Sequence, residues 1–171
     1  MQIALLQTSQ HHAMLNLLAE LNAHYHADSL ATAQTIREHF YSNLMAPESA
    51  LQFVVASTQN DDLLGFAGFS LHYSLTNPLP AMAKQCQLKE LFVSERARGL
   101  GIGTALMRWL AAYALTHHCA RIDWPVHAAN ARGLAFYQSL GAEQQDSRLT
   151  FRLNQAAMLK LATAAQATQI N

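Results

Sequence analysis

The chain has 171 residues, of which 51% are hydrophobic and 13% are charged, and its 11 basic and 11 acidic residues give a formal net charge of zero. With this balance the chain has no excess positive charge to attract nucleic acid or an anionic membrane surface, so we expect neither as a partner. The length suits a single domain over residues 1–171. No apolar run approaches the ~20 residues that a membrane-spanning helix requires.

The cysteines and histidines bear on the compartment and on metal binding. Cys86 and Cys119 lack CxxC spacing, and the first residues lack the basic-then-apolar order of a signal peptide, so we expect a reduced, cytoplasmic protein. The nine histidines include adjacent pairs but no i, i+4 pair of the kind that forms a helical zinc site. We therefore expect no metal.

The first part of the chain predicts two helices. After a short apolar opening, Ser9 can cap a helix whose apolar residues recur every three or four positions. These residues are Met14, Leu17, Leu18, Leu21 and Tyr25. A break at residues 26–29 leads to a second helical pattern, which the Ala-Pro dipeptide at 46–47 ends. Its apolar positions are Ile36, Phe40 and Leu44.

The middle of the chain predicts strands. Residues 51–57 and 63–75 are rich in β-forming residues and are separated by a polar turn, which indicates a hairpin. After a loop, residues 85–93 alternate well enough to form a third strand.

A strand–helix–strand crossover follows, in which the strand 85–93 precedes a glycine-rich loop, a helix and a strand at 120–126. Such a crossover predicts parallel pairing of the two strands. Pro125 donates no ladder hydrogen bond, so we expect the strands to part near it and to leave a place for a ligand. The chain then predicts a helix from Asn130 to Leu140 that stops at Gly141, a last strand at 149–154 and an alanine-rich closing helix.

The loop at 98–104 leaves much of the backbone bare, because glycine stands at 99, 101 and 103 just before a helix. Amides at a helix start point outward and carry partial positive charge, so this loop suits a phosphate or a diphosphate. A tight strand-to-helix turn without a ligand is the alternative. The loop has no lysine before Thr104, as a Walker loop requires, and its spacing fits GxGxxG poorly.

Two blocks carry a family resemblance. The string LKELFVSERARGLGIG at 88–103 resembles the acetyl-CoA loop of the GNAT superfamily of N-acetyltransferases, and NARGLAFYQSLGA at 130–142 resembles the next conserved block of that family. The stretches 122–142 and 148–162 resemble more narrowly the diamine (spermidine/spermine) acetyltransferase branch. The resemblance covers about residues 50–160 well, and the first 45 only through their helical pattern.

The resemblance implies a set of residues that bind acetyl-CoA. The backbone of Leu91, Phe92 and Val93 would face the pantetheine arm, with the Val93 N–H near the thioester carbonyl. Asn130 would contact the cofactor, and Tyr137 would lie near the sulfur and protonate the departing thiolate; a core aromatic residue is the alternative for Tyr137. The diphosphate would be held by the loop residues Arg98, Gly99, Leu100, Gly101, Ile102, Gly103 and Thr104.

The acceptor amine is charged at neutral pH, so a base must remove a proton from it. Glu90 is the first candidate for this base because it lies two residues before Phe92 on the same strand face. The alternative is that Glu90 is a strand-end carboxylate paired with an arginine or a lysine. His127 is an alternative base or a pocket residue.

Tyr25 and Asp28, in the link between the first two helices, would help to bind the substrate. His24 and His26 in the same segment are further candidates, and exposed polar residues without a role are the alternative.

The sequence as a whole indicates an α/β (α+β) fold of the GNAT kind, with a mixed, mostly antiparallel sheet, a central parallel splay and flanking helices. We expect an acetyl-CoA-dependent N-acetyltransferase that acts by direct attack in a ternary complex on a small polyamine-like or amino-acid-like amine. Diamine acetyltransferases tend to carry two adjacent acids where this chain has Lys89 and Glu90, which weakens the polyamine assignment. The alternatives are a non-enzymatic acyl-CoA-binding module and an enzyme for peptide or protein amines. The resemblance also implies a homodimer.

Overall fold

The computed structural model describes residues 1–28 and 30–168, so Ser29 and the last three residues lie outside the described part. The chain divides into two compact units, Met1–Ala129 and Asn130–Asn171, and each is described here by itself. The expectation of a single domain stays a prediction.

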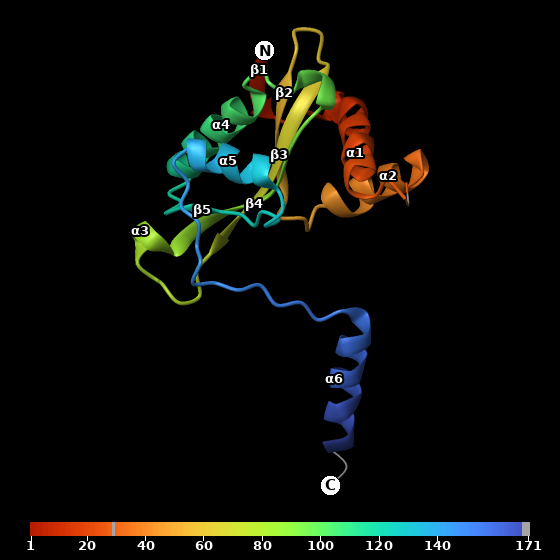
Figure 1. Ribbon diagram of the computed structural model, residues 1–171, viewed down its shortest axis with the longest axis vertical. Coiled ribbons are helices and arrows are strands. Elements are labelled where there is room, and N and C mark those ends of the chain that lie inside the picture. Colours follow the sequence, from red (N-terminus) through yellow and green to blue (C-terminus); the bar gives the residue numbers. More distant parts are fainter. Residues whose placement is uncertain (29, 169–171) are drawn as a thin grey trace. The chain divides into compact units, whose positions relative to one another are not determined.

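The first unit is built on one sheet with helices on both faces (Figure 1). Its strands are β1 (Gln2–Leu5), β2 (Gln52–Ser57), β3 (Leu63–Tyr73), β4 (Lys84–Val93) and β5 (Ile122–Asp123). Its α-helices are α1 (His11–Tyr25), α2 (Ala33–His39), α3 (Pro80–Ala83) and α4 (Ile102–Thr116). Shorter turns are η1 (Thr8–Gln10), η2 (Phe40–Leu44, π-helical) and η3 (Glu95–Ala97).

The five strands follow one another in chain order, β1-β2-β3-β4-β5. The first four are antiparallel neighbours, and only the β4–β5 pair, joined through α4, is parallel. The mixed, mostly antiparallel sheet and the crossover are therefore confirmed. The parallel pair stands at an edge of the described sheet rather than at its centre.

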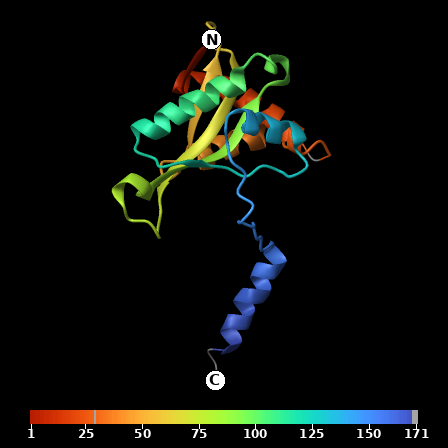
Figure 2. The ribbon, with the colours of Figure 1, turned by 60° about the vertical axis from the view of Figure 1, so that its left-hand side comes forward.

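Opposite faces of the sheet carry α1 and α4 (Figure 2). On the α1 face lies a buried apolar cluster that α1, η2 and strands β2 to β4 share. Its buried members are Met14, Leu17, Phe40, Phe53, Val55, Leu63, Phe66 and Phe92. On the other face, Ile102, Leu106 and Leu110 of α4 are buried against the sheet. Because both faces are covered, strand β4 is held in place along the part that leads to the glycine loop.

Several local expectations for this unit need correction. Ser9 does not cap α1, because it lies inside η1 and the residue that precedes α1 is Gln10. The second helical pattern divides into α2 and the π-helical turn η2. The strand expected at 120–126 shortens to the two residues of β5, and the apolar opening forms an edge strand, β1.

The second unit contains α5 (Ala131–Ser139) and α6 (Gln155–Thr168), as expected for both helices. Gly141 has a φ of 83°, a left-handed conformation that ends α5 as the sequence indicated. The strand expected at 149–154 is wrong, since the structure has no regular element there. An isolated strand needs a neighbouring strand, and the described residues of this unit contain none.

Among the described residues, the structure has no helix whose length and hydropathy would let it cross a membrane. The cytoplasmic location stays a prediction.

Candidate active site

The glycine loop joins β4 to α4 and has the conformation that only glycine adopts readily. Gly99 has a φ of 82° and Gly101 a φ of 74°, both in the left-handed region. A Cβ added at either glycine would meet no atom within 4 Å, so open space lies beside the backbone. The glycines are therefore required by backbone geometry, and they also leave the backbone accessible.

The amides at the start of α4 are available to a ligand. The first helical hydrogen bond runs from the Ala105 N–H to the Gly101 carbonyl, 3.0 Å away. An α-helix bonds each N–H to a carbonyl four residues earlier, so the N–H groups of Ile102, Gly103 and Thr104 have no helical acceptor. With the positive end of the helix dipole, they form a suitable site for an anion.

The arginine that opens the loop fixes it to the strand. Arg98 donates from Nε to the Val93 carbonyl at 3.2 Å and from Nη1 to Glu95 Oε1 at 3.1 Å. Ala97 is buried, whereas the Leu100 side chain is 70% exposed and points away from the core. Arg98 thus holds the turn in shape, and a contact between its guanidinium and a cofactor stays a prediction.

Strands β4 and β5 separate early, as the sequence predicted. Their ladder consists of Cys86 paired with Ile122 and Gln87 paired with Asp123. The Gln87 side chain then donates from Nε2 to the Asp123 carbonyl at 2.9 Å, and Pro125 two residues later has no N–H to offer. Within the described residues, β4 from Leu88 onward therefore has no partner on the β5 side.

The direction of the amides at the end of β4 follows from one hydrogen bond. The Ser94 N–H donates toward β3, to the Leu64 carbonyl at 2.9 Å. Successive amides of a strand point to alternate sides, so the Val93 N–H points away from β3, toward the gap left by β5. A backbone donor thus faces the gap next to the glycine loop.

Glu90 lies on the α1 face of β4, as Phe92 does, because the two pair with Gly68 and Phe66 of β3. The Tyr25 hydroxyl at the end of α1 donates to Glu90 Oε1 at 3.4 Å. Burial raises the pKa of Glu90 above its usual range, although the Leu91 N–H, the Tyr25 hydroxyl and the His24 ring each act to lower it. Burial and the neighbouring Glu90 charge raise the pKa of Tyr25. Glu90 is therefore a more basic carboxylate than an exposed one.

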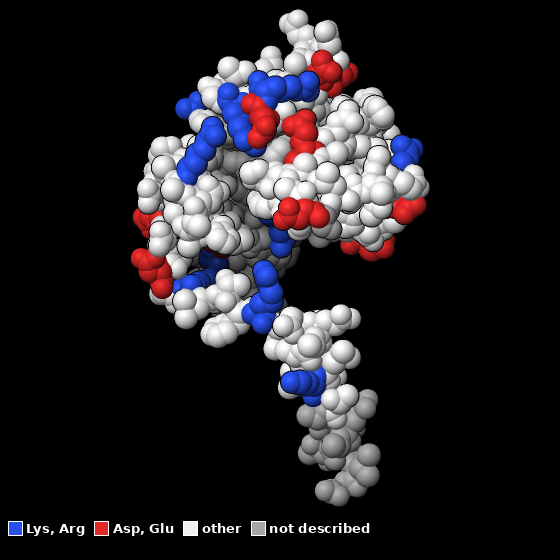
Figure 3. All heavy atoms as spheres, turned by 45° about the vertical axis from the view of Figure 1, so that its right-hand side comes forward, with Lys and Arg blue, Asp and Glu red and all other residues white. Residues whose placement is uncertain are grey.

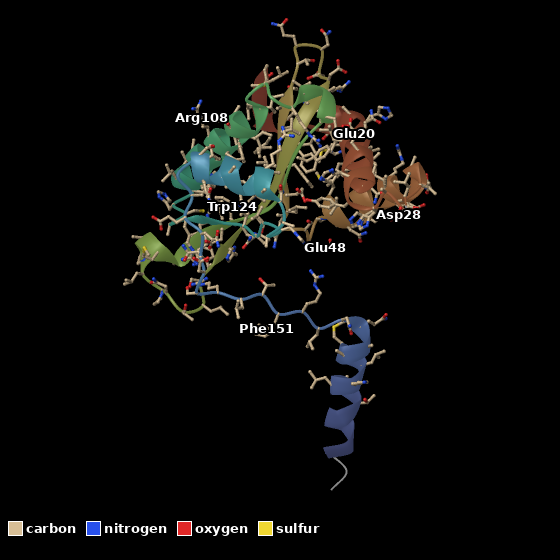
Figure 4. All side chains as sticks on the ribbon, in the orientation of Figure 1. Glu20, Asp28, Glu48, Arg108, Trp124 and Phe151 are labelled. Carbon is tan, nitrogen blue, oxygen red and sulfur yellow. The ribbon has the colours of Figure 1, made fainter. Side chains whose placement is uncertain are left out.

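A cleft of about 500 Å³ opens between α1 and the end of β4. It is lined by Glu20, Ala23, His24, Phe92, Ser94, Glu95, Arg96 and Arg98. Its charged groups are two acids and two arginines, and Glu20 lies on α1 (Figure 4). Figure 3 shows basic and acidic side chains side by side on one face of the molecule. The cleft thus carries charges of both signs, and its lining residue Phe92 lies on the same face of β4 as Glu90.

Among the described residues of the first unit, Asp28 and His127 are not joined to Glu90 by any hydrogen bond or ion pair that the structure gives. Asp28 is exposed in the link beyond α1 (Figure 4). His127 is exposed and its Nδ1 accepts the Ala129 N–H at 3.2 Å, which holds its own loop. Asn130 caps α5 by accepting the Gly133 N–H at 2.9 Å. Tyr137 lies half-buried on α5, in the second unit, so its role and that of Asn130 at a thioester stay predictions.

One feature of the site escaped the sequence analysis. The register of β4 shifts at Lys89, because Leu88 pairs with Phe69 whereas Glu90 pairs with the adjacent Gly68. This β-bulge leaves the exposed Lys89 as an extra residue beside Glu90. His24, a candidate substrate-binding residue in the sequence, lines the cleft. Only the structure could reveal the bulge, since the strand's apolar pattern does not mark it.

Parted parallel strands and a glycine loop whose free amides open a helix suit a ligand with an extended arm and a phosphate group. The family comparison identifies the class of protein. The Acetyltransferase (GNAT) family pattern matches residues 12–142, so the chain belongs to the GNAT family of acetyltransferases. This confirms the interpretation of the two sequence blocks at the level of the superfamily.

Known proteins resemble this chain to different degrees. An integron cassette protein from the mobile metagenome of V. cholerae is 31% identical, with a TM-score of 0.83 over 94% of this chain and 96% of that one. Mouse thialysine N-epsilon-acetyltransferase is 29% identical over 98 residues, which span only 56% of either chain. A ribosomal-protein-alanine N-acetyltransferase from Brucella melitensis shares the fold at 23% identity, with a TM-score of 0.68 over 90% of this chain and all of that one.

Replacing Gly101 with valine tests the loop. A β-branched residue is strained at a φ of 74°, so the loop must change shape and its amides must move. We expect the Kd for CoA, measured by titration calorimetry, to rise roughly tenfold or more. Gly141→Val is the matched control, because it places the same side chain at a φ of 83° outside the loop. Equal CoA affinity of the Gly101 variant and the wild type would contradict the anion site.

Proposed function

We propose that the chain is an acetyl-CoA-dependent N-acetyltransferase that transfers an acetyl group to a primary amine of a small molecule. The observation that carries the proposal is the coincidence of two features at the end of β4. The strand loses its β5 partner after Gln87, and the chain then forms a loop whose amides open α4. A gap that is followed directly by an anion site suits a ligand whose extended arm ends in a diphosphate.

The fit of CoA to this region can be stated by residue. The amides from Gly99 to Thr104 would hold the diphosphate, and the backbone of β4 from Leu91 to Val93 would bind the pantetheine arm. The Leu91 N–H already contacts the Glu90 carboxylate, so Val93 is the amide left to meet a thioester carbonyl. Asn130 would also contact the cofactor, as the family resemblance implies.

The proposed reaction requires proton transfer at the acceptor nitrogen and at the leaving thiolate. Glu90 takes one proton from the acceptor ammonium, which leaves a neutral amine. As the nitrogen bonds to the acetyl carbon and the carbon–sulfur bond breaks, Tyr137 gives a proton to the thiolate, and the second proton of the nitrogen passes through solvent to restore Tyr137. Acetyl-CoA supplies the acetyl group. Glu90 suits a base because burial raises its pKa, and a tyrosine keeps its proton at neutral pH and so suits an acid.

Replacing Glu90 with glutamine should lower kcat/KM for the amine by roughly 100-fold or more, as expected when a general base is lost. In the wild type, activity should fall on the acid side as Glu90 takes up a proton, at a pH above the ordinary range of a carboxylate. The variant should lack this acid limb. Glu48→Gln, at an exposed glutamate of the α2–β2 connection (Figure 4), is the control. An unchanged pH profile would exclude Glu90 as the base.

Replacing Tyr137 with phenylalanine should cut kcat while leaving the Kd for acetyl-CoA within about twofold, because only the hydroxyl is removed. Tyr73→Phe, at a tyrosine that is 68% exposed on β3, is the matched control. Pre-steady-state measurement of thiol release would locate the effect in the chemical step. Normal turnover would leave Tyr137 as a packing residue.

The charge of Lys89 helps to decide between classes of acceptor amine. A diamine would bring a second ammonium toward this exposed cation beside Glu90, whereas an amine that also bears a carboxylate would be attracted to it. The mouse relative is named for an acetyl transfer to thialysine, which supports the same choice. We therefore propose an amino-acid-like acceptor, with Tyr25, Asp28 and His127 as further substrate-binding residues.

The acceptor proposal is tested by measuring CoA release with L-lysine and with 1,5-diaminopentane, the same chain without the carboxylate. The wild type should prefer lysine, and Lys89→Glu should shift the ratio of kcat/KM values toward the diamine by roughly tenfold. Lys160→Glu in α6 is the charge-matched control. A wild type that prefers the diamine, or that acetylates only peptide amines, would refute the acceptor class. CoA binding without acetyl transfer to any amine would indicate a binding module.

A further inference from the structure

His24 lies at the meeting point of the cleft and the proposed base. Its ring centroid is 5.0 Å from that of Tyr25, at 70°, and 6.4 Å from that of Phe92. It lines the cleft, it is exposed, and it is close enough to Glu90 to act on that carboxylate electrostatically. The proposed acetyl transfer gives this residue no task.

Glu90 needs an outlet for the proton that it collects. Its carboxylate is half-buried, and the Tyr25 hydroxyl and the Leu91 N–H both donate to it. After each transfer the carboxyl must lose its proton before the next amine arrives. Tyr25 already carries its own proton, and its raised pKa keeps it there, so the phenol is a donor to Glu90 and does not take the proton up.

We propose that His24 carries the proton from Glu90 to the water of the cleft. This inference rests on the proposed function. The amine gives a proton to the Glu90 carboxylate, the carboxyl gives it through water to a ring nitrogen of His24, and the imidazolium releases it to the water of the cleft. Glu90 returns to its ionised form and His24 to its neutral form, while Tyr137 regains its proton through solvent. Imidazole suits this task because it takes up and releases protons near neutral pH.

Charges of both signs surround His24. Glu20 on α1 and Glu95 on η3 line the same cleft as Arg96 and Arg98, and the Glu90 carboxylate acts on His24 as a third negative charge. Arg98 is already paired with Glu95.

Two substitutions separate proton transfer from packing. His24→Phe keeps a ring against Tyr25 and Phe92 but cannot take up a proton, and His24→Ala leaves room in an open cleft for added imidazole. We expect kcat to fall roughly tenfold in both variants, with the Kd for CoA unchanged. Imidazole in the buffer should restore the Ala variant in proportion to its concentration. His26→Ala, two residues further along at the end of α1, is the control and should match the wild type.

The outcomes separate this inference from the function that it rests on. Wild-type kcat in both His24 variants, or a loss that imidazole does not restore, would overturn the proton path while leaving the acetyltransferase in place. Rescue of the Ala variant, with none in Glu90→Gln, would support it. A wild type that acetylates no amine would overturn the proposed function and the path together.

Discussion

The arrangement depends on where one β-ladder stops. Strands β4 and β5 pair over two residues each, and the ladder then ends because the Gln87 side chain occupies the Asp123 carbonyl and Pro125 has no N–H. A continuous ladder would consume the backbone groups of β4 near Val93. Because the ladder stops, these backbone groups stay unpaired on the β5 side. They come just before a loop whose glycines adopt left-handed backbone conformations, so the gap beside β4 leads to the free amides at the start of α4.

The same strand links the two halves of the proposed chemistry. Toward the gap, β4 offers backbone groups, and on its α1 face it holds Glu90 against Tyr25. The opposite face is buried under α4, so β4 has little freedom to shift. A base on one face and backbone donors along the edge of a fixed strand provide the preorganisation that acyl transfer requires. The parts from the second unit, Asn130 and Tyr137, enter this account through the family resemblance.

Much of this could be predicted from the sequence because its signals are local. The glycines at 99 and 101 and the proline at 125 indicated the loop and the separation of strands through backbone chemistry that depends on few neighbours. The strand expected at 149–154 was wrong because a strand depends on a partner that its own pattern does not supply. The bulge at Lys89 and the approach of His24 to Glu90 depend on the register between strands and on the packing of α1, which no single segment encodes.

The central claim is that amides at the start of α4 and at the end of β4 bind the carrier. The most direct measurement is a titration of the ¹⁵N-labelled protein with CoA, followed by amide chemical shifts. The account predicts that the largest changes fall on Gly99 to Thr104 and on Val93, with the amides of β1 unaffected. Saturable CoA binding that leaves the loop amides unmoved, or no binding at all, would contradict it.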